Sequence, residues 1–321
     1  MQIIRYLLTA SVLCAFAMTA SAQGYPNKPI HFVVGFAPGG GTDVMARAIG
    51  AKLGEALGTQ VVVENRPGAN GNLAAEVTAK AAPDGYTLMI ISVSHAISRS
   101  LYKNLRYDLL KDYAPLSSIA TVPNVIVVGP SRPVGSLKEL IAQAKADPRR
   151  ITYGTSGAGS PEHLAAVMLG LTAGVEMIHV PYKGGALSAL DVVAGHVDVG
   201  FNTMPVALPH IKGGKMKALA VTDSKRVGVL PDVPTVAESG YPQYAISTWY
   251  GIVVPTGTPK EIVTRLNSEI AKILTLPDMR ERLAGLGAEP LGGTSEQFGQ
   301  LMQSEVAKFA KIIKDANLQG E

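Results

Sequence analysis

Cysteine is almost absent from this chain. Cys14 is the only cysteine, and it stands inside an apolar N-terminal segment that we expect to be removed. The remaining chain would then have no disulfide framework, no thiol nucleophile and no cysteine metal site. The six histidines form no pair with the spacing of metal ligands, so we expect no metal and no cofactor. Such a chain is compatible with an oxidising compartment.

A strong excess of charge of one sign is also lacking. Lysine and arginine number 29 against 25 aspartates and glutamates, a formal net charge of +4. This balance is too even to indicate a nucleic-acid partner or an anionic membrane surface. After the N-terminal segment, no apolar run approaches the roughly 18 residues that span a bilayer. The chain is long enough for two domains with cores of their own.

The N-terminal segment has the layout of a secretory signal peptide. Arg5 precedes the apolar run from Tyr6 to Met18, and Ala20-Ser21-Ala22 offers small residues at both positions that a signal peptidase reads. We therefore predict a signal peptide over residues 1–22, cleavage after Ala22 and a periplasmic protein. A permanent membrane anchor is the alternative, although the run is short for a spanning helix.

Strand-like runs rich in Val, Ile and Tyr alternate with helix-like runs along the rest of the chain. This alternation predicts an α/β fold with mostly parallel sheets. Strands are expected at 30–36, 61–64, 87–92, 124–129, 151–154, 177–182, 197–201, 217–222 and 249–255. Helices are expected at 42–57, 72–82, 136–146, 160–171, 185–194, 259–275, 277–286 and 295–316. In the last of these, apolar residues at helical spacing predict one buried face: Phe298, Leu301, Met302, Val306 and Phe309.

Three glycine-rich loops each follow a predicted strand and open a predicted helix. They read APGGGTD at 37–43, YGTSGAGSP at 153–161 and PYKGGA at 181–186. Free N–H groups at a helix start, together with the positive end of its dipole, favour a carboxylate or a phosphate. Lys183 is the only cation within these loops, so backbone groups, hydroxyls and water would hold the anion. Ordinary tight turns are the alternative interpretation.

The loops match no nucleotide-binding or hydrolase motif. The first lacks the Lys-Ser or Lys-Thr of a P-loop, and neither of the first two reads G-x-G-x-x-G. Ser160 and His163 stand three residues apart and could form a nucleophile and a base, but the glycine spacing of a nucleophile elbow is missing. Asp43 would repel an anion on the same N–H groups, so we expect it to cap its helix, to hold a water or to meet a donor group on the ligand.

Four segments together resemble one known family. They are YPNKPIHFVVGFAPGGGTDVMARAIGAKL at 25–53, VENRPGANGNLAAEVTAKAAPDGYTLMI at 63–90, YGTSGAGSPEHL at 153–164 and VPYKGG at 180–185. They resemble the Bug family, the TctC-like extracytoplasmic receptors of tripartite tricarboxylate transporters. The resemblance implies a periplasmic binding protein (type II-like) fold: two α/β domains joined by two crossover strands, with the ligand cleft between them. One domain would comprise 25–123 plus 247–321, the other 124–246, with crossovers at Val125–Val128 and Gly251–Val254.

The resemblance also implies the site. The first two loops would grip a carboxylate like pincers, the third loop and Asn202-Thr203 would line the remainder, and the segment at 92–98 would touch the distal end of the ligand. Carried onto this sequence, the ligand-binding residues are Phe36, Ala37, Pro38, Gly39, Gly40, Thr42, Asp43, Ser92, Ser94, Thr155, Ser156, Gly157, Ser160, His163, Lys183, Gly184, Asn202 and Thr203.

We therefore expect a monomeric, non-enzymatic receptor that captures a small carboxylate and delivers it to membrane transporter subunits. Dicarboxylates, tricarboxylates, acidic amino acids and aromatic carboxylates all fit. A signalling receptor of the same fold is one alternative, and a secreted hydrolase that uses Ser156 or Ser160 is another. A structural or adhesive protein fits less well, because it would have no use for three converging anion loops.

Overall fold

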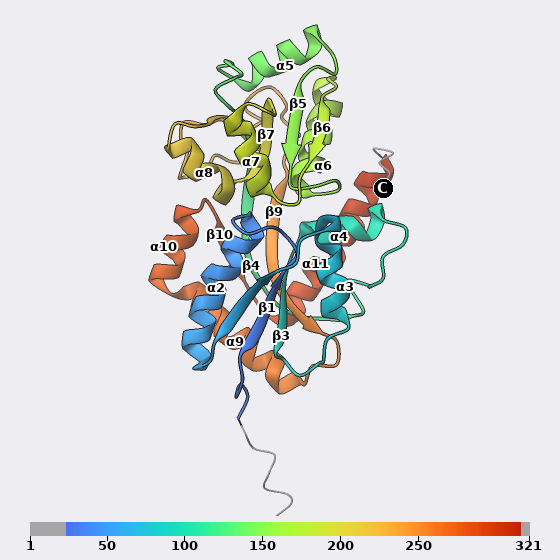
Figure 1. The fold of residues 1–321 in the computed structure, drawn as a ribbon, viewed down its shortest axis with the longest axis vertical. Coiled ribbons are helices and arrows are strands. Elements are labelled where there is room, and N and C mark those ends of the chain that lie inside the picture. The colour runs from blue at the N-terminus through green and yellow to red at the C-terminus, as the bar shows by residue number, and fades with distance from the viewer. Residues whose placement is uncertain (1–23, 316–321) are drawn as a thin grey trace, which may run out of the picture.

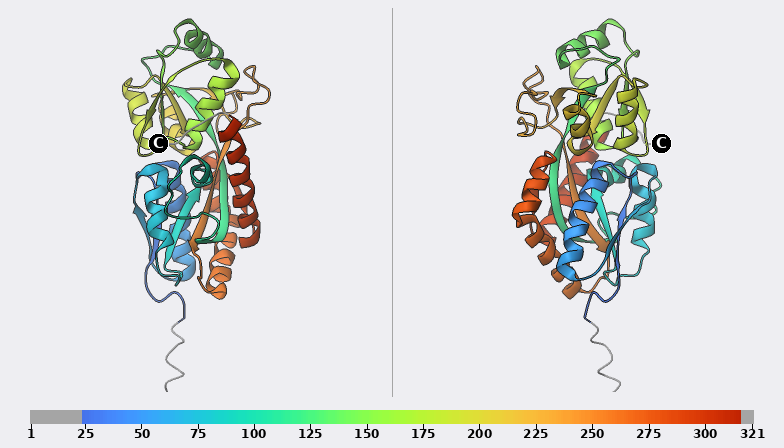
Figure 2. Two further views of the ribbon diagram at one scale, coloured as in Figure 1. Left: turned by 90° about the vertical axis from the view of Figure 1, so that its right-hand side faces the viewer. Right: turned by 60° about the vertical axis from the view of Figure 1, so that its left-hand side comes forward.

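The strand β4, Tyr113–Val128, runs through both halves of the molecule. The computed structural model describes residues 24–315, and in it two α/β lobes lie end to end (Figures 1 and 2). The predicted signal peptide and the last residue of the predicted C-terminal helix, Ala316, lie outside these residues. No helix in the described part is long and apolar enough to cross a bilayer.

The lower lobe of Figure 1 is a mixed sheet covered by helices. Its strands lie in the order β2 (Val61–Asn65), β1 (Ile30–Val34), β3 (Thr87–Ser92), β9 (Ser247–Pro255), β4 and β10 (Glu289–Gly292). Helices α2 and α9 pack against one another, and α11 packs on α4 and β4. The helices are α2 (Gly41–Leu57), α3 (Asn72–Ala79), α4 (Val93–Leu101), α9 (Lys260–Thr275), α10 (Pro277–Gly285) and α11 (Ser295–Asp315), with the 3-10 turn η1 (Ala69–Gly71).

The upper lobe repeats this plan on a smaller scale. Its strands lie in the order β8 (Lys217–Val221), β4, β7 (Val199–Thr203), β5 (Thr152–Thr155) and β6 (Ile178–Pro181). Its helices are α5 (Leu137–Ala146), α6 (Pro161–Ala173), α7 (Gly185–Ala194) and α8 (Met204–Lys212). The α/β prediction is confirmed, but the sheets are less parallel than expected. Strands β1, β2 and β3 are parallel, as are β5, β6 and β7, whereas β4 and β9 run antiparallel to all their partners.

The chain passes between the lobes twice, at two adjacent points. Within β4, Pro123 still pairs with β9 of the lower sheet, and the next residue, Asn124, pairs with β7 of the upper sheet. The return passes through Ile246, whose N–H donates to the carbonyl of Thr222 at 2.9 Å. The Thr222 hydroxyl donates back to the Ile246 carbonyl at 2.6 Å.

One predicted crossover is therefore wrong. Gly251–Val254 lies well inside the lower sheet, where it pairs with β3 and β4, and the chain has already crossed at Ile246. The residues of this segment are buried, as expected of a strand covered on both faces of its sheet. The other candidate, Val125–Val128, is the part of β4 just beyond the change of partners.

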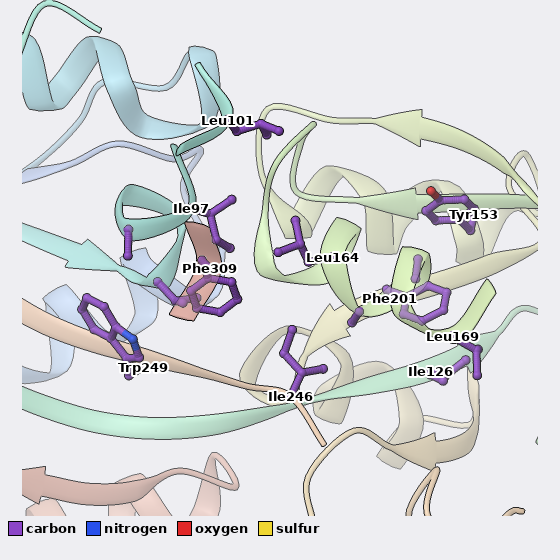
Figure 3. Packing of buried hydrophobic residues seen from close by; sticks show 14 of the residues in the cluster. Ile97, Leu101, Ile126, Tyr153, Leu164, Leu169, Phe201, Ile246, Trp249 and Phe309 are labelled. Carbon is purple, nitrogen blue, oxygen red and sulfur yellow. The ribbon is translucent and has the colours of Figure 1, made fainter. Parts of the chain in front are cut away.

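One cluster of buried apolar side chains contains residues of both lobes. Figure 3 shows Ile97 and Leu101 of α4 facing Leu164 of α6, with Ile246 and Phe309 close by. All of these side chains are buried. The predicted buried face of α11 is confirmed, since Phe298, Met302 and Phe309 are buried. The other two residues predicted for that face, Leu301 and Val306, are partly buried and pack against the same cluster.

Candidate ligand-binding cleft

Five helices begin around one small cavity between the lobes. Each is the next element after a strand, so the carboxyl ends of β1, β3, β5, β6 and β7 meet there, as is usual for ligand sites in α/β folds. The cavity is lined by Phe36, Gly40, Gly41, Thr42, Ser92, Ser94, Ser156, Pro161, Glu162, Gly185, Thr203, Thr248 and Tyr250. These include a cap or first-turn residue of α2, α4, α6, α7 and α8. The positive ends of five helix dipoles therefore converge on it.

The lobes are closed over this cavity, which has a volume of about 20 Å³. That is room for about one water molecule, so a larger ligand enters only when the lobes separate, and the form that closes on it is slightly wider than this one. A second cavity of about 260 Å³ adjoins it and shares Phe36 and Ser156. It is lined by loops of both lobes: residues 35–36, 68–71 and 102 from the lower one, and 156–158 and 181–183 from the upper.

Among the described residues, three hydrogen bonds join a loop of the lower lobe to a loop of the upper lobe across the cleft. The Ala37 N–H donates to the Lys183 carbonyl at 3.2 Å. The side-chain amide of Asn70 donates to the Gly159 carbonyl at 3.0 Å, and the Tyr102 hydroxyl donates to the Ala158 carbonyl at 3.1 Å. Each bond joins a loop of the lower lobe to a glycine loop of the upper one. In this structure these bonds to backbone carbonyls hold the loops of the two lobes together.

The first glycine loop lines the cavity with only part of the set predicted for it. Phe36, Gly40 and Thr42 are in the lining, whereas Pro38 and Gly39 are not. Asp43 also lies behind the lining, where its carboxylate accepts from the Gly39 N–H at 2.9 Å, from Arg47 at 3.0 Å and from Asn65 at 2.8 Å. Burial alone would raise the pKa of Asp43, but these hydrogen bonds outweigh it and hold the pKa below its usual range. The geometry makes Asp43 a brace for the loop.

The second glycine loop is also divided between lining and support. Ser156 lines both cavities and Gly157 lines the larger one. Thr155 instead bonds to the His179 ring at 2.7 Å, and the Ser160 hydroxyl caps α6 by accepting from the His163 N–H at 3.1 Å. These side chains therefore shape the loop from behind.

His163 lies outside the lining as well. Its ring accepts from the Gly159 N–H at 3.1 Å and stacks on His179, with the ring centroids 4.1 Å apart. Burial lowers the pKa of His163 to about 4, so the stacked imidazole is neutral at physiological pH. A neutral ring is a good acceptor for a loop N–H, and this role fixes the turn that presents Ser156.

The remaining predicted residues lie at the third loop and at two further helix starts. Lys183 lines the larger cavity, and Gly184 packs against Ala37 of the other lobe. Thr203 is in the lining. Asn202 lies behind it and donates to the carbonyl of Gly185, a lining residue at the start of α7, at 3.2 Å. Ser92 and Ser94 both line the small cavity, where Ser92 caps α4.

Several residues of the lining were not predicted from the sequence, chiefly Glu162 and Tyr250. Both are buried, and the Ser156 hydroxyl donates to the Glu162 carboxylate at 2.7 Å. Tyr250 reaches the cavity from β9, and its hydroxyl is hydrogen-bonded to Thr203 of the upper lobe. Gly41 lies against both, because a Cβ there would be 2.5 Å from the Thr203 and Tyr250 hydroxyls. The one sequence signal for Glu162 is its place two residues after Ser160, in the first turn of the helix that the second glycine loop opens.

The lining suits reversible binding of an anion and shows no catalytic arrangement. Among the described residues that form it there is no lysine, arginine or histidine. The Ser160 hydroxyl caps α6, the Ser156 hydroxyl donates to Glu162 and the His163 ring accepts from a backbone N–H, so neither serine is paired with the His163 ring in this structure. Within residues 24–315, no group of three or more His, Cys, Asp or Glu side chains could hold a metal ion.

Comparison with known proteins gives relatives over almost the whole chain. Residues 45–318 match the family described as tripartite tricarboxylate transporter family receptor, TctC. Protein BugT of Bordetella pertussis (strain Tohama I) is 37% identical over 320 residues, which cover 98% of each chain.

Solved structures confirm the expected fold. Rpa4515 of R. palustris, solved with adipate, is 38% identical with a TM-score of 0.90, over 92% of this chain and 100% of that one. The periplasmic binding protein BugD is 35% identical with a TM-score of 0.89, over 92% of this chain and 100% of BugD. The resemblance of the glycine loops to the Bug family is thereby confirmed, and the fold is that of periplasmic binding proteins. The chain belongs to the TctC family of tripartite tricarboxylate transporter receptors.

Proposed function

We propose that this protein is a periplasmic receptor that captures a small carboxylate between its lobes and delivers it to membrane subunits of a tripartite tricarboxylate-type transporter. The observation that carries the proposal is the meeting of five helix N-termini at a buried cavity without a cationic side chain. Backbone N–H groups and hydroxyls there can surround a carboxylate, and the dipoles favour its charge. The adipate in Rpa4515 supports this class of ligand.

The mechanism is closure of the lobes around the ligand. In the open form a ligand would meet only one lobe, whereas closure brings both glycine loops to it at once. This difference in contacts shifts the equilibrium towards the closed form. The hydrogen bonds from Ala37 and Asn70 to the upper lobe add to the stability of the closed form. The domains would then be 25–123 plus 247–321 and 124–246, which agrees with the change of strand pairing at Asn124.

The protein performs no chemistry in this proposal, needs no cofactor and acts as a monomer. The predicted signal peptide would place it in the periplasm. The ligand-binding residues would be those of the lining, while Asp43, Thr155, Ser160 and His163 hold the loops in position.

A thermal-shift screen tests the proposal. The chain from Gln23 onward is mixed with mono-, di- and tricarboxylates, acidic amino acids, aromatic carboxylates and neutral controls. A ligand at a hundredfold excess over its Kd should stabilise the folded state by about 2.7 kcal/mol. Stabilisation by carboxylates and not by neutral analogues is expected. Stabilisation by sugars alone, with carboxylates inert, would contradict it.

A further inference from the structure

Glu162 is the one charged side chain among the described residues that line the small cavity. It stands in the first turn of α6 and is only 4% exposed. No lysine, arginine or histidine of the described chain forms an ion pair with it, since its carboxylate appears in none of the salt bridges. Its side-chain partners are hydroxyls: Ser156, which donates at 2.7 Å, and Ser160. A buried carboxylate is thus held without a counter-charge at the site of an anionic ligand.

The lower lobe closes over this carboxylate. Tyr250 of β9 interacts electrostatically with Glu162 and bonds to Thr203, so the Glu162 carboxyl lies where the two lobes meet. Burial raises the pKa of Glu162, while the hydrogen bond from Ser156 opposes the rise, so a cation beside this carboxyl group would favour its ionised form. Closure therefore removes from water both Glu162 and whatever ligand group faces it.

The chemistry of the ligand follows from this arrangement. A second carboxylate placed against Glu162 would have to share a proton with it or bring two like charges together in a water-poor space, and either costs free energy at neutral pH. A protonated amine would instead give the buried carboxylate the partner that it lacks. The helix N-termini would still bind a carboxylate on the same molecule, so the two parts of the cavity are complementary to a zwitterion.

We propose that Glu162 selects, within the carboxylate class of the proposed function, ligands that also carry a protonated amine. The inference rests on that function and narrows it. Glu162 is a specificity-determining residue that meets the ammonium group directly, and Ser156 is a positioning residue that orients the carboxylate. The helix N-termini at Gly41 and Thr203 bind the carboxylate group at the other end of the ligand.

Matched pairs of ligands test this inference by calorimetry at neutral pH: glutarate against glutamate, succinate against aspartate, and butyrate against 4-aminobutyrate. The wild-type chain should bind at least one amino member about tenfold or more tightly than its partner, as expected for a hydrogen bond between charged groups. Glu162→Gln keeps the size of the side chain and an acceptor for Ser156 and removes the charge. In this variant the ratio of the two Kd values should fall to about one. The unsubstituted acid should bind the variant as tightly as the wild type, or more tightly.

Glu176→Gln is the matched control, because Glu176 lies on the surface of the same lobe and its side chain is 73% exposed. It should leave every ratio unchanged, and unfolding curves check that both variants fold. Equal or tighter binding of the unsubstituted acid by the wild type, or a preference that survives in Glu162→Gln, would overturn the inference and leave the carboxylate receptor standing. A folded wild type that binds no member of any pair, and no other carboxylate, would instead remove the proposed function.

Discussion

The N–H of Ala37 donates to the carbonyl of Lys183 at 3.2 Å, and this bond joins the first glycine loop of one lobe to the third glycine loop of the other. The approach is close because the residues are small. Gly184 has a φ of 146°, and a Cβ on it would lie 3.2 Å from the Cβ and the N of Ala37. The glycines of these loops thus serve the contact between lobes as well as the exposure of N–H groups to a ligand.

Loss of the Asn70 amide should weaken ligand binding. Asn70 has a φ of 55°, which glycine also adopts, so Asn70→Gly keeps the turn and deletes the bond to Gly159. One net hydrogen bond contributes about 0.5–1.5 kcal/mol, so Kd should rise by up to about tenfold. Stopped-flow binding should show most of the change in the dissociation rate, because the bond forms only on closure. An unchanged dissociation rate would mean that Asn70 does not hold the lobes together.

Gly41→Ala should prevent full closure. The new Cβ would lie 2.5 Å from the hydroxyls of Thr203 and Tyr250, one on each lobe. Overpacking of this kind costs about 1–3 kcal/mol, so affinity should fall by about tenfold or more. Gly228→Ala is the control, since nothing lies within 4 Å of the Cβ position there. Small-angle scattering with saturating ligand should show a more open Gly41→Ala protein, and an equally compact one would count against this closed geometry.

The brace at Asp43 predicts a pH-dependent effect on stability. Because its pKa is held below the ordinary value of 3.8, the ionised Asp43 stabilises the fold above that pH. The contribution is lost as the pH falls through the lower, folded-state pKa. Asp43→Asn should therefore lower the free energy of unfolding by about 1–2 kcal/mol at neutral pH, a discounted value because Arg47 is half exposed.

Urea unfolding of both proteins across the acid range measures this difference. It should shrink as the pH falls below 3.8, because the wild-type carboxylate then becomes protonated. A difference that stays constant down to the most acid point would show that the brace acts by shape and not by charge.

Gly251 in β9 should tolerate no side chain. A Cβ there would overlap the ring of Phe298 from α11, and both residues are buried against the shared apolar cluster. Gly251→Ala should destabilise the fold by about 1–3 kcal/mol in urea unfolding. Adding Phe298→Leu should cost less in the Gly251→Ala background than in the wild type, because the smaller side chain leaves room. Strict additivity of the two changes would contradict direct contact.

The glycine loops can be predicted from the sequence, but which of their residues line the cavity and which support the loop from behind cannot. A hydroxyl in a loop before a helix can face a ligand or cap its own helix, and only the packed structure decides. Ser160 caps α6, whereas Ser156 faces the cavity. Glu162 was overlooked because an acidic residue in a first turn is ordinarily explained by the helix dipole. Tyr250 stands in a strand that is buried along almost its whole length, so nothing in the sequence marks its side chain as one that reaches the cavity.

The strands and helices with strong periodicity were predicted well, and those with proline or many polar residues were missed. The part of β4 before the predicted strand, residues 113–123, contains Pro115 and Pro123 and pairs with irregular register, so its sequence does not indicate a strand. Helix α8 contains Pro205 and Pro209, which argue against a helix from sequence alone. Helix α4 follows β3 without a turn residue, and only its Ser92–His95 capping box marks its start.

The most direct test of the account is a crystal structure with the carboxylate that binds most tightly in the thermal-shift screen. We predict closed lobes with one carboxylate of the ligand at the helix starts, within hydrogen-bond distance of N–H or hydroxyl groups of Thr42, Ser156 or Thr203. A ligand found instead in the shallow groove of about 600 Å³ on the outer face of the upper lobe, lined by Arg149, Leu171 and Glu176 among others, would contradict the account.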